Sequence, residues 1–381
     1  MNKTIAIVIN TSWNIFNFRM GLIEALQAKG YRVVAIAPRD TYSTKLQEMG
    51  IEYHEIVINS KGMNPFKKLI LIYKLYKLYK VITPDVVLLY TIKPNIFGSI
   101  AAWFSRTPVI SNISGLGTLF INPTIYSKIA SLLYDIALHI PRKIFFQNSY
   151  DRSLFIKLKL VEAAKSELLP GSGINTSKFH PTPSNTNRKG IQFLFIARLV
   201  RDKGLVEYVE AARDIKKLGG MDNIEFAILG SFYAGNPTAI TQEQMELWQE
   251  EGIINYLGST DDVKSVVDGC DCVVLPSYRE GMSRVLLEAA SMAKPIITTK
   301  VPGCKEVVEH GVNGYLCRSK DIESLRIQIQ KMIELTHEER VEMGKRGREK
   351  MIREFEEQIV IDKYLDTIEA IIAEEAEESQ G

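Results

Sequence analysis

Several features that define whole classes of proteins are missing from this sequence of 381 residues. The first apolar run, residues 5–9, is shorter than the hydrophobic core of a secretory signal, which needs about 7–15 residues. The longest stretch without charge, residues 107–127, is interrupted by Pro, Asn, Gly and Ser, so it is not expected to form a membrane-spanning helix. We therefore expect a cytoplasmic protein that is soluble or lies on a membrane surface.

Motifs for metals, redox chemistry and nucleic acids are also missing. The five histidines are scattered, no Asp-x-Asp falls in a plausible loop, and no nucleic-acid-binding motif is present. Gly115-Leu116-Gly117 lacks the third glycine of a dinucleotide fingerprint. The four cysteines form no Cys-x-x-Cys pair, and we interpret them as reduced core residues: Cys270, Cys272, Cys304 and Cys317. The sequence thus predicts no metal site, no cofactor and no nucleic-acid partner.

The small net charge of +2 hides an asymmetry between the two halves of the chain. Residues 1–188 contain 23 Lys+Arg and 10 Asp+Glu, whereas residues 189–381 contain 24 and 35. The first half therefore carries +13 and the second −11. This contrast indicates that the first half meets an anionic partner.

Short β-branched runs alternate with helix-length segments in both halves, which is typical of parallel α/β domains. A stretch rich in Pro, Gly, Ser, Thr and Asn, residues 170–190, reads as a linker. We predict two Rossmann-like, doubly wound domains that face a cleft, over residues 1–182 and 183–355. A helix over residues 356–381 is expected to cross back to the first domain and to end in a frayed acidic tail. The expected strands are residues 4–10, 32–37, 52–58, 85–90, 108–111, 143–147, 191–197, 224–229, 254–257, 272–276 and 296–299.

The second domain contains residues suited to a sugar nucleotide. Glu280 and Gly281 follow a predicted strand and precede a helix, so the amides at the helix start can bind an anion or the polar edge of a sugar. Glu288, two turns into that helix, can accept hydrogen bonds from ribose hydroxyls. We expect Glu280 to hold sugar hydroxyls rather than to join an ion pair. The amides concerned belong to Met282, Ser283, Arg284 and Val285.

Two cations follow the first strand of the same domain. Arg198 and Lys203 lie beside Gly204 on a strand-to-helix turn, where they could clamp a diphosphate. Charge-assisted hydrogen bonds contribute about 1.5–3 kcal/mol each, which is enough for fixed cations to hold a leaving diphosphate without a metal ion.

Together with two glycine-containing segments, these residues resemble the large retaining glycosyltransferase family of GT-B fold that uses nucleotide sugars, family four. The added segments are Pro302-Gly303-Cys304-Lys305-Glu306-Val307-Val308 and Gly311-Val312-Asn313-Gly314. Three segments of the first half look like the bacterial subgroup that extends undecaprenyl-diphosphate-linked saccharides for capsule, O-antigen or N-glycan precursors. They are Phe18-Arg19-Met20, Tyr90-Thr91-Ile92-Lys93-Pro94-Asn95 and Ser114-Gly115-Leu116-Gly117.

The resemblance implies a role for each donor-side residue. Arg198 and Lys203 would hold the diphosphate, and Glu288 the ribose. Glu280 and the amides after it would hold the transferred sugar. The implied reaction moves a sugar, such as the N-acetylhexosamine GalNAc, from UDP to a polyprenyl-diphosphate-linked saccharide. It would proceed at the front face of the anomeric carbon, without metal and with retention. Two alternatives remain, a GT-B nucleotide-sugar 2-epimerase and a non-enzymatic sugar-nucleotide-binding scaffold.

The first half departs from the family pattern. Many relatives carry Gly-Gly after the first strand, where this chain has Asn10-Thr11-Ser12-Trp13-Asn14. Ile92 stands where some relatives have histidine, so a general base from this domain stays unassigned. Ser12, Arg19 and Lys93 are the candidates for the acceptor or its diphosphate.

Residues 65–82 are predicted to form one helix. Apolar residues at offsets 0, 4, 7 and 11 give a core seam of Leu71, Leu75, Leu78 and Ile82, flanked by Tyr76 and Tyr79. Lys74, Lys77 and Lys80 lie on another face. That face is either solvated or in contact with an anionic membrane, where each lysine contributes about 1 kcal/mol.

Overall fold

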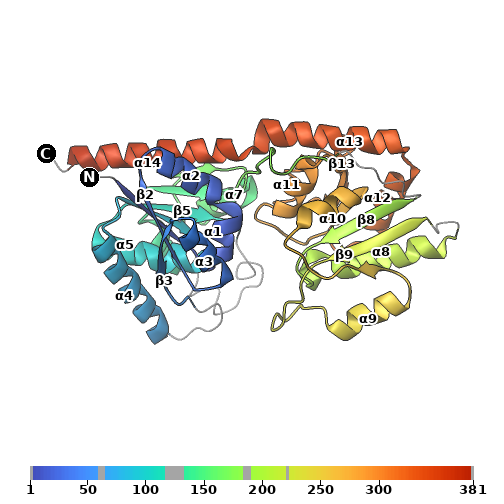
Figure 1. The fold of residues 1–381 in the computed structure, drawn as a ribbon, viewed down its shortest axis with the longest axis horizontal. Helices are drawn as coiled ribbons and strands as arrows, with labels where there is room; N and C mark the ends of the chain where they lie inside the picture. The colour runs from blue at the N-terminus through green and yellow to red at the C-terminus, as the bar shows by residue number, and fades with distance from the viewer. Residues whose placement is uncertain (1–2, 59–64, 116–132, 183–189, 220–222, 379–381) are drawn as a thin grey trace. The chain divides into compact units, whose positions relative to one another are not determined.

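The computed structural model describes residues 3–58, 65–115, 133–182, 190–219 and 223–378, and it divides into two units. Unit 1 comprises Met1–Ser172 and Gln358–Gly381, and unit 2 comprises Gly173–Glu357 (Figure 1). Leu116 and Gly117, part of the subgroup motif, lie outside the described residues. Each unit contains a parallel sheet covered by helices, which confirms the predicted Rossmann-like architecture.

The unit 1 sheet has seven parallel strands in the order β3-β2-β1-β4-β5-β6-β7. Six of them match the predicted strands. The seventh, β7, was not predicted because its three residues, Ser-Glu-Leu, lack a β-branched run. The strands are β1 (Thr4–Val8), β2 (Arg32–Ala37), β3 (Glu52–Glu55), β4 (Val86–Tyr90), β5 (Val109–Ile113), β6 (Lys143–Phe146) and β7 (Ser166–Leu168).

Alternate residues of these strands point to opposite faces of the sheet. Ile5 and Ile7 pack with α14 (Glu357–Glu378) on one face, whereas Ala6 and Val8 pack with α4 (Pro65–Ile82) and α5 (Ser99–Ser105) on the other. The helices labelled in this unit are α1 (Ser12–Phe18), α2 (Met20–Ala28), α3 (Thr41–Glu48), α4 (Pro65–Ile82), η1 (Pro94–Gly98), α5 (Ser99–Ser105), α7 (Ser149–Lys157) and α14 (Glu357–Glu378).

Helix α14 changes the charge balance of the folded units. The expected frayed tail is wrong, because the helix continues to Glu378 and Arg142 pairs with Glu375 at 2.6 Å and with Glu378 at 3.2 Å. These acidic residues belong to unit 1, which therefore contains 22 Lys+Arg and 17 Asp+Glu, against 25 and 28 in unit 2. The contrast of +13 and −11 between sequence halves is thus only +5 and −3 between folded units.

The chain enters unit 2 earlier than the predicted boundary at residue 182. Ile174 and Phe179 are buried in the core of unit 2, and the Ile174 amide donates to the Phe355 carbonyl at 2.8 Å. Gly173 has φ +71°, and a Cβ there would lie 2.4 Å from Cα of Glu357. The polar composition of the segment concealed these two apolar side chains, which fix it to unit 2.

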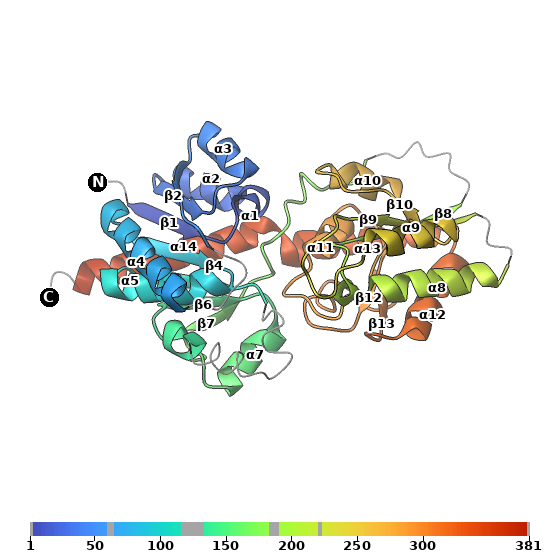
Figure 2. The same ribbon diagram turned by 90° about the horizontal axis from the view of Figure 1, so that it is seen from below.

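The unit 2 sheet has six strands in the order β10-β9-β8-β11-β12-β13. Figure 2 shows this unit turned by 90° from the view of Figure 1. Strand β13 was not predicted. The strands are β8 (Ile191–Ile196), β9 (Ile224–Leu229), β10 (Asn255–Tyr256), β11 (Cys272–Leu275), β12 (Ile296–Thr299) and β13 (Gly314–Cys317). The helices are η3 (Arg201–Lys203), α8 (Leu205–Lys217), α9 (Gln242–Glu250), α10 (Val263–Gly269), α11 (Arg284–Ser291), α12 (Ile322–Glu334), α13 (His337–Lys350) and η4 (Met351–Phe355).

Candidate active site

The central strands of unit 2, β8 and β11, bring the expected donor residues together. The strand order reverses between these two strands, and ligands of open α/β sheets bind beyond the carboxyl ends of the strands at such a point. Arg198 and Lys203 follow β8, and Glu280 follows β11. The residues expected to act at the sugar diphosphate therefore lie at one edge of one sheet.

Gly204 holds the turn that carries Lys203 against the end of β11. This glycine has φ +76°, and a Cβ there would lie 2.1 Å from the carbonyl oxygen of Pro276. A side chain is therefore excluded at this position. The amide of Tyr278 donates to the carbonyl of Asp202 at 2.9 Å, which ties the two loops together. Backbone contacts thus set Lys203 beside the loop that contains Glu280.

Lys203 and Glu280 form an ion pair. Nζ lies 2.5 Å from Oε1, and the two side chains are only 18% and 14% exposed. The expectation that Glu280 stays out of an ion pair is therefore wrong, because the Gly204 turn brings a lysine next to it. An ammonium group has three donors, so Lys203 can bind Glu280 and a phosphate oxygen at the same time.

The segment after β12 supports the Glu280 loop. Gly303 has φ +80°, and a Cβ there would lie 2.5 Å from the Glu280 carbonyl oxygen. The Glu280 amide donates to Pro302 at 3.2 Å, and the Gly303 amide donates to Oε2 of Glu306 at 2.7 Å. The sequence motif marked these residues as part of the family pattern but did not reveal their task, which is to support the loop.

The expected anion site at the helix start is smaller than predicted. Helix α11 begins at Arg284, and the amide of Ser283 already donates to the Gly303 carbonyl at 2.9 Å. Ser283 is therefore not available to a ligand. The amides of Arg284 and Val285 lie in the first helical turn, where no intrahelical acceptor exists for them. Gly281 and Met282 form a bend between Glu280 and the helix.

Glu288 is held by the side chain of Arg284, a contact that sequence reasoning missed. Nε of Arg284 lies 2.9 Å from Oε1 of Glu288, and Nη1 donates to the Gly173 carbonyl at 2.5 Å. Burial raises the pKa of Glu288, while Arg284 and Lys178 oppose that rise. The i,i+4 spacing of Arg284 and Glu288 on a helix is visible in the sequence, but the burial of the two side chains is not.

Arg198 differs from Lys203 in being exposed. Its guanidinium carbon lies 4.8 Å from the centroid of the Tyr233 ring, and no carboxylate among the described residues pairs with it. A cation over an aromatic face keeps its full charge for a ligand. Arg198 thus remains placed to bind an anion.

Tyr278 and Glu207 form a further polar pair at this edge. The Tyr278 hydroxyl donates to Oε1 of Glu207 at 2.6 Å, and burial together with Glu207 raises the pKa of the tyrosine. Oε2 of Glu207 is buried and has no partner among the described residues. No signal in the sequence marked either residue.

On unit 1, Arg19 is a buried cation at the carboxyl end of β4. Only 5% of the residue is exposed, and its guanidinium carbon lies 4.2 Å from the centroid of the Tyr90 ring. Within the described chain no carboxylate pairs with it, and Nε has no hydrogen-bond partner. Because a buried charge without a counterion is costly, this position is suited to an anionic ligand.

Lys93 lies in the chain segment that follows β4, three residues after Tyr90, whose ring contacts Arg19. Thr91, a β-branched residue, has φ +67°, a strained conformation of the kind that clusters at functional sites. Burial and the positive charge of Lys68, on the first turn of α4, lower the pKa of Lys93. Two lysines that repel each other form a second place on unit 1 where an anion is favoured.

Ser12 is not available to bind an acceptor, because its polar groups are already hydrogen-bonded within unit 1. The side chain is buried, and its hydroxyl lies 3.0 Å from the Pro38 carbonyl and 2.9 Å from the Tyr53 hydroxyl. Its amide donates to Asp40 at 3.0 Å. The candidate role of Ser12 at the acceptor is therefore corrected to one of holding the loop after β1.

Helix α4 has the predicted bounds, and Lys74, Lys77 and Lys80 are exposed as predicted. Leu71, Leu75 and Ile82 are buried. Tyr79 is buried too, at 1% exposure, and replaces the half-buried Leu78 in the seam.

All four cysteines are buried free thiols, as predicted. Burial raises the pKa of Cys317 to about 12. In the part of the chain that the structure describes, no group of three His, Cys, Asp or Glu side chains could hold a metal ion, and no helix could cross a membrane.

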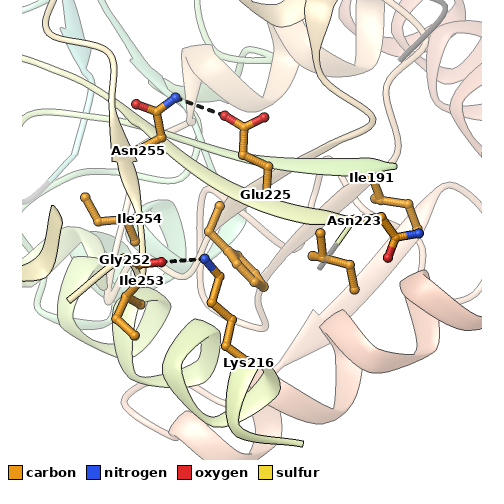
Figure 3. Close-up of a pocket in the computed structure, with 10 residues that line it drawn as sticks. Ile191, Lys216, Asn223, Glu225, Gly252, Ile253, Ile254 and Asn255 are labelled. Atoms are coloured by element: carbon orange, nitrogen blue, oxygen red, sulfur yellow. Dashed lines mark hydrogen bonds between the residues drawn. The ribbon is translucent and has the colours of Figure 1, made fainter. Parts of the chain in front are cut away.

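A pocket of 370 Å³ in unit 2 lies away from these residues (Figure 3). It is lined by the starts of β8, β9 and β10, at the edge opposite Lys203 and Glu280. Lys216 donates to the Gly252 carbonyl at 2.6 Å and Asn255 donates to Glu225 at 3.0 Å, so these two side chains are already paired within the protein. This pocket is not the donor site.

Known families match both units. The family described as "Glycosyl transferases group 1" matches residues 177–350, and the one described as "Glycosyl transferase 4-like" matches residues 4–148. The former range contains every donor-side candidate, and the latter contains Arg19 and Lys93.

Two curated relatives cover most of the chain. The N,N'-diacetylbacillosaminyl-diphospho-undecaprenol alpha-1,3-N-acetylgalactosaminyltransferase of Campylobacter jejuni is 26% identical over 94% of this chain and 96% of that protein. The UDP-Gal:alpha-D-GlcNAc-diphosphoundecaprenol alpha-1,3-galactosyltransferase of Escherichia coli is 27% identical over 81% and 80%.

Solved structures show the same fold. A glycosyltransferase from Rickettsia africae matches with a TM-score of 0.79 at 18% identity, over 97% of this chain and 99% of that one. Anabaena Alr3699/HepE in complex with UDP and glucose matches with a TM-score of 0.77 at 19% identity, over 96% and 99%.

Proposed function

Because this chain belongs to the group 1 glycosyltransferases of GT-B fold, we propose that it transfers a sugar from UDP to a polyprenyl-diphosphate-linked saccharide. The sugar is an N-acetylhexosamine such as GalNAc, and the pathway builds bacterial surface polysaccharide or glycan. The observation that carries the proposal is the set of Arg198, Lys203 and Glu280 at the carboxyl ends of β8 and β11. The names of the two curated relatives supply the substrate class.

On the donor side, unit 2 binds the UDP-sugar through paired groups. Arg198 and Lys203 hold the diphosphate, and Glu288 accepts hydrogen bonds from the ribose. Glu280 contacts the transferred sugar next to the diphosphate. Lys203 can therefore contact both Glu280 and the diphosphate. The two cations supply charge that otherwise comes from a divalent ion, so the reaction proceeds without metal.

The transfer retains the anomeric configuration. The bond between the anomeric carbon and the diphosphate oxygen breaks, and the acceptor oxygen bonds to that carbon on the same face. The departing phosphate oxygen takes the proton of the acceptor hydroxyl, so neither a protein nucleophile nor a separate base is needed. Arg198 and Lys203 stabilise the negative charge that develops on the leaving UDP.

On the acceptor side, unit 1 binds the lipid diphosphate. Support comes from the buried guanidinium of Arg19, which has no carboxylate partner within the described parts of the chain, and from the Lys68 charge beside Lys93. A polyprenyl-linked acceptor resides in a membrane, so the protein acts as a cytoplasmic enzyme bound peripherally to the inner face of the cell membrane. It has no nucleic-acid partner.

A donor and acceptor screen tests this function. The full chain is incubated in EDTA with labelled UDP-sugars and undecaprenyl-diphosphate-linked saccharides. Transfer of one sugar, with the donor configuration kept, is the expected result. Absence of transfer across the panel would refute it, and conversion of the UDP-sugar without acceptor would instead indicate a 2-epimerase. Restoration of activity only by magnesium would refute the metal-independent mechanism.

A further inference from the structure

The outer face of helix α4 carries apolar side chains that the core does not use. Phe66, Leu69, Ile70 and Tyr73 are 74%, 63%, 53% and 55% exposed. Their spacing of i, i+3, i+4 and i+7 places them on one face over two helical turns, and we call them the apolar stripe. Single exposed apolar residues are normal on a protein surface, but a row of four large ones is not.

The neighbouring helix also has exposed aromatic residues, but they lie just before β5, at the amino edge of the sheet, and are not part of the apolar stripe. Helix α5 packs against α4 and ends in Trp103 and Phe104, which are 62% and 57% exposed. Their ring centroids lie 4.9 Å apart. Both helices cover the same face of the unit 1 sheet, opposite the face covered by α14.

Lysines continue the row beyond the stripe. Lys74, Lys77 and Lys80 are exposed, and no carboxylate of the described residues lies within ion-pair distance of them. Nζ of Lys77 lies 4.8 Å from the centroid of the Tyr73 ring. Helix α4 contains five lysines and no acidic residue. Its surface is therefore positively charged, although the net charge of unit 1 as a whole is small.

The stripe lies toward the edge of the sheet that carries the acceptor cations. Helix α4 ends at Ile82, just before β4 begins at Val86, so its last turn is at the amino edge of the sheet. At 1.5 Å per residue its 18 residues span about 27 Å, which brings its first turns to the opposite, carboxyl edge. Lys93 and Tyr90, at the end of β4, lie at that edge.

We propose that the apolar stripe enters the interfacial layer of an anionic bilayer, while Lys74, Lys77 and Lys80 bind lipid phosphates. A helix with apolar and aromatic residues beside lysines is the composition that binds such an interface. A second copy of this chain is a poor occupant, because it would bring two basic helices together. The proposal deepens the membrane location stated under Proposed function and rests on it, since the bilayer supplies the lipid-linked acceptor next to Arg19 and Lys93.

Vesicle binding of the full chain tests this surface directly. The variant Leu69→Gln/Ile70→Gln is compared with Leu218→Gln/Leu247→Gln, a control that changes two exposed leucines of unit 2, 59% and 52% exposed. On phosphatidylcholine vesicles containing phosphatidylglycerol, we expect the stripe variant to bind at least tenfold more weakly and the control to bind as the wild type does. Equal binding of all three, or absence of wild-type binding, would overturn the proposal.

A labelled cysteine gives an independent readout. The four native cysteines are buried, so Leu69→Cys provides one accessible thiol for an environment-sensitive dye. We expect the emission to shift to shorter wavelength on anionic vesicles, with no shift for labelled Leu218→Cys. A shift without vesicles that rises with protein concentration would overturn the proposal in favour of a contact between copies.

One further assay distinguishes an error in the proposed membrane surface from an error in the proposed function. A short-chain, water-soluble acceptor diphosphate does not require a bilayer. The stripe variant is expected to use it at the wild-type rate and to lose at least tenfold in rate on the vesicle-embedded acceptor. If the wild type uses neither acceptor while the vesicle results hold, the proposed function fails and the membrane surface stands. Equal rates of variant and wild type on embedded acceptor would overturn the surface.

Discussion

The two units treat positive charge in opposite ways. In unit 2, Lys203 is paired with Glu280 and Arg284 with Glu288, and all four side chains are at least four-fifths buried. In unit 1, the buried Arg19 has an aromatic ring beside it and no carboxylate among the described residues. The buried cations of the candidate site in unit 2 are therefore already balanced by carboxylates, whereas the exposed Arg198 of the same site is not. Unit 1 contains a buried cation that no carboxylate of the described residues neutralises.

This difference is local and does not follow from total charge. Once α14 is counted with unit 1, the two units differ only modestly in net charge, at +5 and −3. Glu369 and Glu375 of α14 pair with Lys29 and Arg142, and the apolar side of α14 packs on the face of the sheet opposite α4. Under the proposed function, side-chain placement rather than the sum of charges separates the donor side from the acceptor side.

The largest expected effect comes from breaking the unit 2 pair. Lys203→Ala removes a diphosphate donor and leaves Glu280 buried without its partner, so transfer should fall about 10³-fold. Steady-state rates with saturating acceptor measure it. Lys217→Ala, which removes an exposed lysine of the same unit, is the control and should keep full activity. Near-normal turnover in Lys203→Ala would remove the residue from the site.

Removing the unit 1 cation should act on the acceptor instead. Arg19→Ala is expected to lower kcat/KM for the lipid acceptor about 10²-fold, because a charge-assisted contact to a phosphate is lost. The KM for the UDP-sugar should stay unchanged. Arg32→Ala, at the amino end of β2, serves as the control. A larger change in donor KM than in acceptor KM would contradict the assignment.

The buried pair at Glu288 predicts a pH dependence on the donor side. Burial raises the pKa of this carboxyl, so the folded state favours its protonated form and its contribution to stability is lost as pH rises through that pKa. Ribose binding needs the ionised form, so UDP affinity should rise through the same range. We expect Glu288→Gln to abolish this rise and to weaken UDP binding about tenfold.

Arg284→Gln sharpens the same test. Arg284 now opposes the upward shift of the Glu288 pKa, so its loss should move the midpoint of UDP binding to higher pH. Calorimetric titration with UDP over about pH 5 to 8 measures this shift. A midpoint that stays in place would show that the pair does not control the carboxyl.

The smallest effect concerns the rigidity of the donor loop. Gly303→Ala and Gly252→Ala both place a side chain at positive φ, but only Gly303 faces a close backbone neighbour. Gly303→Ala should therefore lower the free energy of unfolding by about 1 kcal/mol more than Gly252→Ala. Denaturant titration of both variants gives the comparison. Equal losses would mean that the Glu280 loop can shift freely.

The sequence was sufficient for the architecture because buried parallel strands appear as β-branched runs. Short strands such as β7 were not predicted, because three residues are too few to show a run of β-branched residues. The residue types of the donor site were also predictable, but their pairing was not. Lys203 and Glu280 are 77 positions apart, and only the Gly204 turn brings them into contact. On α4 the lysine face was predicted, whereas periodicity alone did not show that its other outward residues are apolar.

The division between the units is tested most directly by the UDP affinity of two variants. The account predicts that Lys203→Ala loses most UDP binding in calorimetric titration, while Arg19→Ala binds UDP as tightly as the wild type although its kcat/KM for the lipid acceptor is about 10²-fold lower. Wild-type UDP affinity in Lys203→Ala, or lost UDP affinity in a folded Arg19→Ala, would contradict it.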